Sequence, residues 1–203
     1  MGFIKTPIKG MNDFLPSDMR LREHVINMIK ETYATYGFSL IETPVMEHLG
    51  NLTGKQGGEN EKLIFPVMKR GADLQRAIEN GGELADSALR YDLTVPLSRY
   101  YANNQAVLTT PFKSLQIGNV FRADRPQKGR FRQFTQCDID ILGDSSILAE
   151  IELIAATTSM LTKIFEEVGI SRFTVHVNDR RILKGMAVSY THLRAHETLS
   201  DLV

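Results

Sequence analysis

The sequence contains one cysteine, Cys137, and no run of apolar residues long enough to span a membrane or form a signal peptide. The lone cysteine excludes an internal disulfide, so a reducing cytoplasm is the expected location. Lysine and arginine number 24, as do aspartate and glutamate, which gives a formal net charge of +0. Any contact with nucleic acid must therefore come from a local basic patch and not from the charge of the whole chain.

The chain also lacks internal repeats and low-complexity segments, and 42% of its 203 residues are hydrophobic. A chain of this size can bury a substantial core and fits one domain or a large part of one. Long helices are predicted from a cap at Ser17 or Asp18 to Gly37, and from a cap at Ser145 or Ser146 to Gly169. Further helices are expected at residues 96–103 and 179–185, and strands at residues 38–42, 63–68, 88–92 and 173–177. We therefore predict an α+β fold with a mostly antiparallel sheet flanked by helices.

The segment from Ser114 to Gly143 carries the most chemical information. Two strand-like runs flank a turn that contains glycine and proline, which is the pattern of an antiparallel hairpin. Basic residues gather at the end of the first run and in the turn, namely Arg122, Arg125, Lys128, Arg130 and Arg132. Because so many neighbouring cations need anions or water as partners, we interpret the hairpin as an anion-binding element.

Side chains on the return strand alternate between two faces. One face is largely apolar, and the other carries Gln136, Asp138 and Asp140. Taken alone, the polar face is best explained as the solvent side of a half-buried strand. The neighbouring basic turn favours another explanation, in which an arginine and the facing acids bind a zwitterionic ligand that carries a phosphate.

Four ordered blocks of sequence stand out along the chain, namely KGMNDFLP, YGFSLIETPVME, LRYDLTVPLSRY and FRADRPQKGRFRQFTQ. Together they resemble the histidyl-tRNA synthetase family, a class II aminoacyl-tRNA synthetase family, in which the second block, with Pro44, is similar to motif 1 and the last to motif 2. The resemblance runs in register from roughly Ile8 to Leu183 and is far more specific than one glycine-rich loop. It implies that residues 1–187 form the N-terminal part of a class II catalytic domain, with its antiparallel sheet flanked by helices.

The resemblance implies a nucleotide-binding set within the hairpin. Arg122 would hold the α-phosphate and the substrate carboxylate during catalysis, and Arg130 would support the phosphates. Asp124 stands where many family members have glutamate, so its contact with adenine is implied to be longer or bridged by water. Gln127 and Lys128, at the tip of the loop, would meet the acceptor end of tRNA; a phosphate-binding loop that never touches tRNA is the alternative.

A histidine-binding set is implied as well, made of Asp92, Leu93, Thr94, Gln136 and Asp140. Asp92 and Thr94 are expected on one face of a strand, with Asp92 accepting from the α-ammonium of histidine. Taken alone, Asp92 is better explained as the N-cap of the helix that follows. Asp138 shares the parity of Gln136 and Asp140 but is left as a structural polar residue.

The implied reaction joins histidine to ATP, with Mg²⁺, and passes the histidyl group to tRNA(His) without a protein nucleophile. No residue is assigned as a metal ligand, no membrane partner is expected, and a homodimer through the motif 1 region is implied. Two alternatives stay open: the non-catalytic regulatory subunit of ATP phosphoribosyltransferase, and an inert structural fragment. Motif 3 is not found in the sequence, so we expect no turnover from these 203 residues, which histidine-dependent pyrophosphate exchange would test.

The sequence changes character after Ala187. Residues 188–203 begin with VSYTHLRAHET, which resembles the translation of a sequencing-library adapter, so we interpret them as a non-native read-through tail. His192 and His196 lie in this tail, but their surroundings do not match a zinc-protease motif and no third ligand is apparent. We assign them no function.

Overall fold

The computed structural model describes residues 2–53, 61–179, 181–182 and 184–186. The tail predicted after Ala187, with His192 and His196, lies outside the described residues. The chain divides into two compact units, Met1–Ile164 and Phe165–Val203. None of the described helices is long and apolar enough to cross a membrane.

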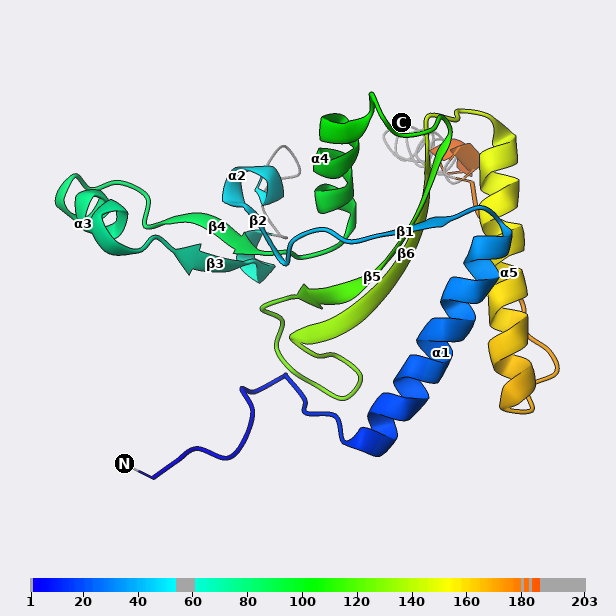
Figure 1. The fold of residues 1–203 in the computed structure, drawn as a ribbon, viewed down its shortest axis with the longest axis horizontal. Helices are drawn as coiled ribbons and strands as arrows, with labels where there is room; N and C mark the ends of the chain where they lie inside the picture. The colour runs from blue at the N-terminus through cyan, green and yellow to red at the C-terminus, as the bar shows by residue number, and fades with distance from the viewer. Residues whose placement is uncertain (1, 54–60, 180, 183, 187–203) are drawn as a thin grey trace, which may run out of the picture. The chain divides into compact units, whose positions relative to one another are not determined.

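The first sheet of the larger unit has the strand order β1-β5-β6, with β1 at Ser39–Ile41, β5 at Phe112–Phe121 and β6 at Gln133–Leu142 (Figure 1). β5 and β6 form the predicted antiparallel hairpin and pair without a break from Phe112↔Leu142 to Phe121↔Gln133. β1 joins β5 in parallel, so the sheet is mixed. The predicted α+β class is confirmed. β5 is the central strand of this sheet, and β6 is an outer strand among the described residues.

One face of the hairpin packs against two helices, α1 (Pro16–Thr35) and α5 (Ile147–Glu167), which lie side by side in Figure 1. The core of this layer consists of Tyr33, Phe38, Leu115, Ala156 and Met160, with Ile139 and Ile141 of β6 packed against it. The predicted apolar face of the return strand is therefore confirmed as a core face. Burial of this kind contributes roughly 1.5 to 3 kcal/mol for each large apolar side chain.

The ends of the two long helices follow the expected signals except at the start of α1, and α5 begins directly after Ser146, one of its two predicted caps. Gly37 has φ +79° and Gly169 has φ +73°, so both glycines take the left-handed conformation that ends a helix. The predicted cap of α1 at Ser17 or Asp18 is wrong, since the helix begins at Pro16. Pro16 suits a first helical position, and Asp18 in the first turn accepts a hydrogen bond from the backbone N–H of Leu15 at 3.2 Å.

A second sheet has the order β2-β4-β3, with β2 at Met46–His48, β4 at Ala85–Leu89 and β3 at Phe65–Met68, all antiparallel. Short helical segments connect these strands: α2 (Leu49–Leu52), η1 (Glu61–Leu63) and α3 (Gly71–Glu79). The predicted strand at residues 88–92 begins and ends earlier, because the chain leaves the sheet after Leu89 to enter α4 (Thr94–Asn104). The helix expected at Pro96 is thus confirmed.

The smaller unit contains little regular structure in its described residues. The strand predicted at residues 173–177 is wrong, since residues 171–179 form neither helix nor strand. Val177 is 72% exposed, and residues 173–177 pair with no strand among the residues that the structure describes. Residues 181–182 and 184–186 are helical, as expected for this segment, and the backbone N–H of Arg181 donates to Asp179 Oδ1 at 2.8 Å.

Arg90 links the two sheets of the larger unit. It follows β4 directly and is 4% exposed, and its Nε donates to the backbone oxygen of Asn119 at 2.8 Å. Its Nη1 donates to the backbone oxygen of Thr43 at 2.7 Å, and its own carbonyl accepts from the N–H of Phe121 at 3.0 Å. The guanidinium occupies the space above Gly118, where a Cβ would lie 2.3 Å from Nη2. Only glycine leaves room for this buried cation.

Replacing Gly118 by alanine should therefore lower the free energy of unfolding by about 1 to 3 kcal/mol, because Arg90 must give up hydrogen bonds to make room. Urea unfolding followed by circular dichroism measures this. Gly50→Ala is the matched control, since a Cβ at Gly50 meets nothing within 4 Å and this glycine lies in α2. Equal stability of the Gly118→Ala and Gly50→Ala variants would contradict the role given to Arg90.

Candidate functional site

The face of the hairpin opposite the core collects polar side chains in a continuous row. The strand register places Gly118 opposite Gln136, Gln116 opposite Asp138 and Ser114 opposite Asp140. These side chains are buried or partly buried, so the row is not the solvent face of a half-buried strand. Gln116 is satisfied, because its Nε2 donates to the carbonyl of Leu93 at 3.1 Å and its Oε1 accepts from the Thr43 hydroxyl at 3.3 Å.

Other members of the row have polar atoms without partners. Ser114 Oγ, Gln136 Oε1 and Asp140 Oδ2 are buried and have no hydrogen-bond partner among the described residues. An unpaired buried acceptor costs about 1 to 3 kcal/mol, so three of them on one face are unusual unless a ligand supplies donors. The row is therefore a candidate binding surface for a group rich in N–H donors.

The acids of the row are electrostatically unfavourable in the absence of a cation. Burial raises the pKa of Asp138, as does the charge of Asp92, whereas Arg122 opposes the rise. Burial also raises the pKa of Asp140, with further contributions from Asp138 and then Asp92. Three carboxyl groups from two elements thus act on one another, and a positively charged ligand group placed there would relieve their repulsion.

Arg122 lies at the end of the same face, directly after β5. Its guanidinium carbon is 4.3 Å from the ring centre of Tyr91 and 5.1 Å from that of Phe134, and its Nε donates to the Tyr91 carbonyl at 3.3 Å. The two rings fix the plane of the guanidinium. Because Nε holds the Tyr91 carbonyl, the two terminal nitrogens are the groups left to bind an anion in bidentate fashion.

A cavity of about 480 Å³ opens beside Arg122. It is lined by Leu63, Tyr91, Arg122, Asp124, Gly129, Arg130, Phe131 and Phe134. Arg130 Nη1 lies 3.9 Å from Asp124 Oδ1, a loose and partly exposed pair that leaves the arginine able to meet another anion. The predicted nucleotide-binding residues Arg122, Asp124 and Arg130 thus line one cavity with apolar and aromatic walls suited to a planar ring.

The predicted histidine-binding residues are only partly brought together. Arg122 and Gln136 share a face of the hairpin as expected, but Gln136 and Asp92 do not line the cavity beside Arg122. That these three residues share one cavity stays a prediction. The charge of Asp92 contributes to the raised pKa of both Asp138 and Asp140 of β6.

The segment around Asp92 is not a strand, which corrects the expectation that Asp92 and Thr94 lie on one face of a strand. Thr94 begins α4 and is exposed, and Asp92 Oδ1 accepts from the backbone N–H of Val95 at 3.2 Å. Asp92 is therefore a helix-capping residue, as its position alone suggested. Leu93 is 1% exposed, which places its side chain in the core, and its carbonyl already accepts from Gln116 Nε2 and from the Leu97 N–H, so its backbone N–H is the part able to face a ligand.

The loop of the hairpin ends in a tight turn. Gln127 and Arg130 exchange backbone hydrogen bonds, at 3.2 Å from the Gln127 N–H and 2.9 Å from the Arg130 N–H. Lys128 and Gly129 form the exposed tip. Gln127 and Lys128 are thus presented to solvent, as expected of residues that contact a large partner.

Sequence reasoning missed the aromatic pair that holds Arg122 and the electrostatic role of Asp138. The position of Phe134, two residues before Gln136 on the same strand, would have placed its ring on the polar face. Tyr91 gave no such signal, because the turn after Leu89 had been predicted as a strand. Asp138 was set aside as structural, although parity placed it beside the acid at Asp140.

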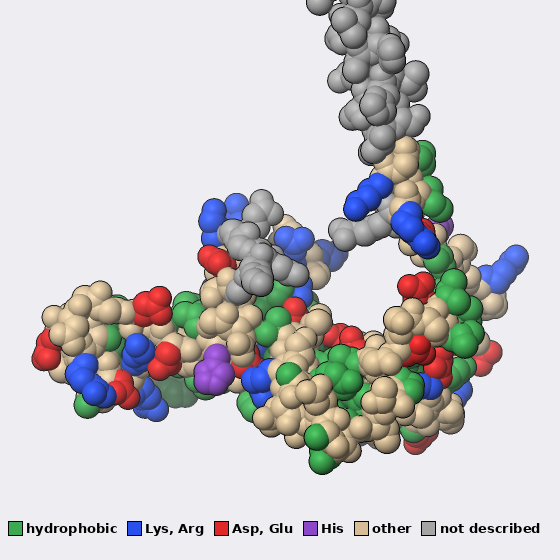
Figure 2. All heavy atoms as spheres, turned by 90° about the horizontal axis from the view of Figure 1, so that it is seen from above, with side chains coloured by type: hydrophobic (Ala, Val, Ile, Leu, Met, Phe, Trp, Pro, Cys, Tyr) green, Lys and Arg blue, Asp and Glu red, His purple; other side chains and the backbone are tan. Residues whose placement is uncertain are grey.

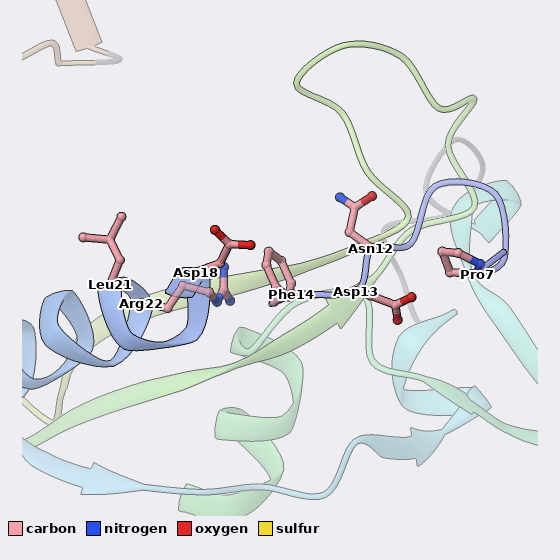
Figure 3. Close-up of a pocket in the computed structure, with 7 residues that line it drawn as sticks. All are labelled: Pro7, Asn12, Asp13, Phe14, Asp18, Leu21 and Arg22. Atoms are coloured by element: carbon pink, nitrogen blue, oxygen red, sulfur yellow. The ribbon is translucent and has the colours of Figure 1, made fainter. Parts of the chain in front are cut away.

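A larger hollow of about 580 Å³ lies on the N-terminal segment, lined by Pro7, Asn12, Asp13, Phe14, Asp18, Leu21 and Arg22 (Figure 3). Two of its charged groups are already partnered, since Arg22 stacks on Phe14 at 4.2 Å and Asp18 accepts from the Leu15 N–H. In Figure 2, acidic and basic side chains are intermixed around α3 and form no large surface of one sign. The row on the hairpin, with its unpaired acceptors, is therefore the better candidate.

Comparisons with known proteins give a consistent result. The family model for histidyl-tRNA synthetase matches residues 10–202. The histidine--tRNA ligase of Leifsonia xyli subsp. xyli is 51% identical over 186 residues, covering 89% of this chain and 42% of that protein. The probable histidine--tRNA ligase of Tropheryma whipplei (strain Twist) is 48% identical over 180 residues, covering 89% and 41%. The chain thus spans about two fifths of the length of these relatives.

Solved structures agree on the fold. The histidyl-tRNA synthetase from Nostoc sp. PCC 7120 superposes with a TM-score of 0.70 at 35% identity, covering 90% of this chain and 39% of that one. A structure described as ATP phosphoribosyltransferase regulatory subunit/histidyl-tRNA synthetase from Bacillus halodurans C gives a TM-score of 0.65 at 23% identity, covering 80% and 38%. At that identity the second similarity shows the fold alone.

The raised pKa of Asp140 makes stability depend on pH. The folded state keeps this proton to a higher pH than the unfolded chain, so Asp140 destabilises the fold once pH rises above the ordinary carboxyl range. Asp140→Asn should therefore be more stable than the native chain at about pH 7, and the difference should vanish near about pH 3. Urea unfolding across this range measures it.

Asp144→Ala is a control of opposite sign, because the N–H of Ser146 holds the pKa of Asp144 below its usual range. That variant should be less stable than the native chain at neutral pH and should match it in acid. A destabilised Asp140→Asn variant at neutral pH would mean that Asp140 is paired in the folded chain.

Proposed function

This chain belongs to the histidyl-tRNA synthetase family, and from that premise we propose that it takes part in the ATP-dependent charging of tRNA(His) with histidine. The observation that carries the proposal is the row on the hairpin. Its unpaired acceptors and neighbouring carboxyl groups lie on the same face as Arg122, whose guanidinium packs against aromatic rings. A cation site and an anion site on one strand pair fit a zwitterionic amino acid joined to a phosphate.

Histidine would occupy the acidic end of the row. Its α-ammonium supplies the positive charge that Asp92, Asp138 and Asp140 lack, and its imidazole supplies N–H donors for Gln136 Oε1 and Asp140 Oδ2. An acid that accepts from the ring would also select the tautomer that donates to it. Leu93, through its backbone, and Thr94, at the exposed start of α4, complete the proposed set.

ATP would occupy the cavity beside Arg122, with Asp124 toward the base and Arg130 toward the phosphates. A carboxylate oxygen of histidine attacks the α-phosphorus, and the bond to the β-phosphate oxygen breaks as pyrophosphate leaves. Arg122 touches both the carboxylate and the α-phosphate, and it stabilises the negative charge that develops between them. No group of three or more potential ligands is positioned to bind a metal among the described residues, so Mg²⁺ would arrive on the ATP phosphates.

In the second step, a ribose hydroxyl at the tRNA end attacks the histidyl carbonyl, and AMP leaves with its phosphate oxygen. The exposed tip at Gln127 and Lys128 would contact the acceptor end, since a lysine there is free to pair with backbone phosphate. This reaction would take place in the cytoplasm, where tRNA is charged.

We further propose a homodimer formed through α1, β1 and the turn to β2. Large apolar side chains are exposed there, at Met19, Leu21, Leu40, Val45 and Met46. Such exposure is costly for a monomer and typical of a surface that another protein covers.

Mutations should affect the proposed histidine site and the proposed ATP site separately. Asp92→Asn keeps a capping side chain for α4 but removes a charge from the ammonium, so histidine affinity should fall about 30-fold, the equivalent of about 2 kcal/mol, with ATP affinity unchanged. Arg130→Gln should weaken ATP and leave histidine unchanged. Isothermal titration calorimetry of each ligand against each variant measures both effects.

The matched control is Asp86→Asn, an exposed acid on β4 whose loss should change neither affinity. Histidine binding without any ATP binding would favour the regulatory-subunit alternative over the ligase. A native chain that binds neither ligand, nor a non-hydrolysable histidyl-adenylate analogue, would refute the proposed function for this chain.

The dimer makes its own prediction. Leu40 on β1 is 55% exposed, and Leu40→Glu should convert a dimer into a monomer in sedimentation velocity experiments, because burying an unpaired charge in the interface is unfavourable. Ile78→Glu changes a residue of α3 that is 58% exposed and should leave the dimer intact. A native chain that sediments as a monomer at high concentration would count against the interface.

A further inference from the structure

The segment before α1 crosses the base of the hairpin loop. Residues 8–11 form a turn in which the N–H of Met11 donates to the carbonyl of Ile8 at 2.9 Å. Gly10 in this turn turns its carbonyl to the return strand, where it accepts from the N–H of Arg132 at 2.7 Å and from that of Gln133 at 3.4 Å. Residues more than a hundred positions apart are thus joined by backbone hydrogen bonds.

Only glycine fits at this crossing. Gly10 has φ +87°, and a Cβ there would lie 2.9 Å from Cγ of Arg132 and 2.9 Å from Cγ of Pro126. Gly81 and Gly129 also have positive φ, yet a Cβ at either would meet nothing within 4 Å. Gly10 is therefore required for close approach as well as for its backbone conformation.

Among the described residues, the loop has one other backbone anchor outside the hairpin. On the outgoing side, the N–H of Ala123 donates to the carbonyl of Leu63 at 2.8 Å. Within the base, the N–H of Arg122 donates to the carbonyl of Arg132 at 2.9 Å, and Arg132 Nε donates to the carbonyl of Asp124 at 3.0 Å. Leu63 thus fixes the outgoing strand and Gly10 fixes the return strand.

The segment is anchored again where it enters α1. The guanidinium of Arg22 stacks on Phe14, and its Nη2 donates to Thr135 Oγ1 of β6 at 2.7 Å. Thr135 donates in turn to Asn119 Oδ1 of β5 at 3.0 Å. Figure 3 shows Phe14 and Arg22 next to each other where the segment meets the helix. The segment is held at both ends and therefore cannot slide along the hairpin.

From these contacts we infer that residues 8–14 form a strap whose Gly10 is a positioning residue for the loop. The strap holds Arg132, and Arg132 is hydrogen-bonded to Arg122 and Asp124 at the start of the loop. The strap therefore determines where the basic side chains of the loop lie relative to the cavity. Residues 123–131 carry no other backbone bond to the rest of the described chain beyond the one at Leu63, so release of the strap frees one side of the loop. The effect on nucleotide binding rests on the function proposed above, whereas the effect on the loop does not.

Hydrogen exchange with mass spectrometry tests the strap without any ligand. Gly10→Ala should raise the exchange of backbone amides in residues 122–133 about tenfold or more, because a clash displaces the acceptor of Arg132 and Gln133. Exchange in the middle of α5 should not change. A deletion of residues 2–11 removes the Gly10 end of the strap without introducing a clash and should release the same loop amides.

Gly81→Ala is the matched control, because it adds a Cβ at positive φ in open space and should leave the loop amides unchanged. Calorimetry then gives a second readout: both strap variants should bind ATP about tenfold more weakly and bind histidine as the native chain does. Unchanged loop exchange in both strap variants would overturn the inference. So would an equal loss of histidine and ATP binding, which would indicate general destabilisation, whereas a native chain that binds no ATP refutes the proposed function alone.

Discussion

The arrangement of the site depends on one buried cation, Arg90, in the space that Gly118 leaves open. Its hydrogen bonds to Thr43 and Asn119 hold the end of β4 against β5, and the next two residues along the chain are Tyr91 and Asp92. Burial lowers the pKa of Arg90, and the charge of Glu42 opposes this. A buried guanidinium costs free energy, and it costs more when its hydrogen bonds are not made. The contacts of Arg90 therefore specify one arrangement of β4, β5 and the residues that follow β4.

The candidate site is unfavourable to the folded chain in a way that suits binding. Unpaired acceptors at Gln136 and Asp140, together with neighbouring acids of raised pKa, cost stability while no ligand is present. The same groups offer a cationic ligand preorganised partners with little competition from water. Arg122 shows the complementary arrangement, because two aromatic rings fix its orientation before an anion arrives. The polar groups of β5 and β6 thus lower the stability of the folded chain, and the same groups would increase its affinity for a ligand.

Local patterns predicted most of the fold, and contacts between distant segments explain what they missed. The glycines that end α1 and α5, the hairpin, and the two faces of β6 all follow from short-range chemistry. The end of β4 was misplaced because the side chain of Arg90 bonds distant backbone at Asn119 and Thr43, which local patterns do not reveal, and the strand expected at residues 173–177 pairs with no strand in the described part of the chain. Gly10 could not be singled out from sequence alone, since its constraint comes from Arg132 and Pro126, far along the chain.

The unbroken pairing of β5 with β6 also limits how this sequence can diverge. Because side chains alternate with a period of two, one residue inserted in β6 before Asp138 would turn Asp138 and Asp140 toward the core and Ile139 toward the polar face. Length variation among descendants of such a hairpin must therefore collect at the exposed tip near Lys128, beyond the last pair. Deletions inside the strands would disrupt the fold and be removed by selection, whereas the tip can lengthen or shorten without shifting the register of β5 and β6.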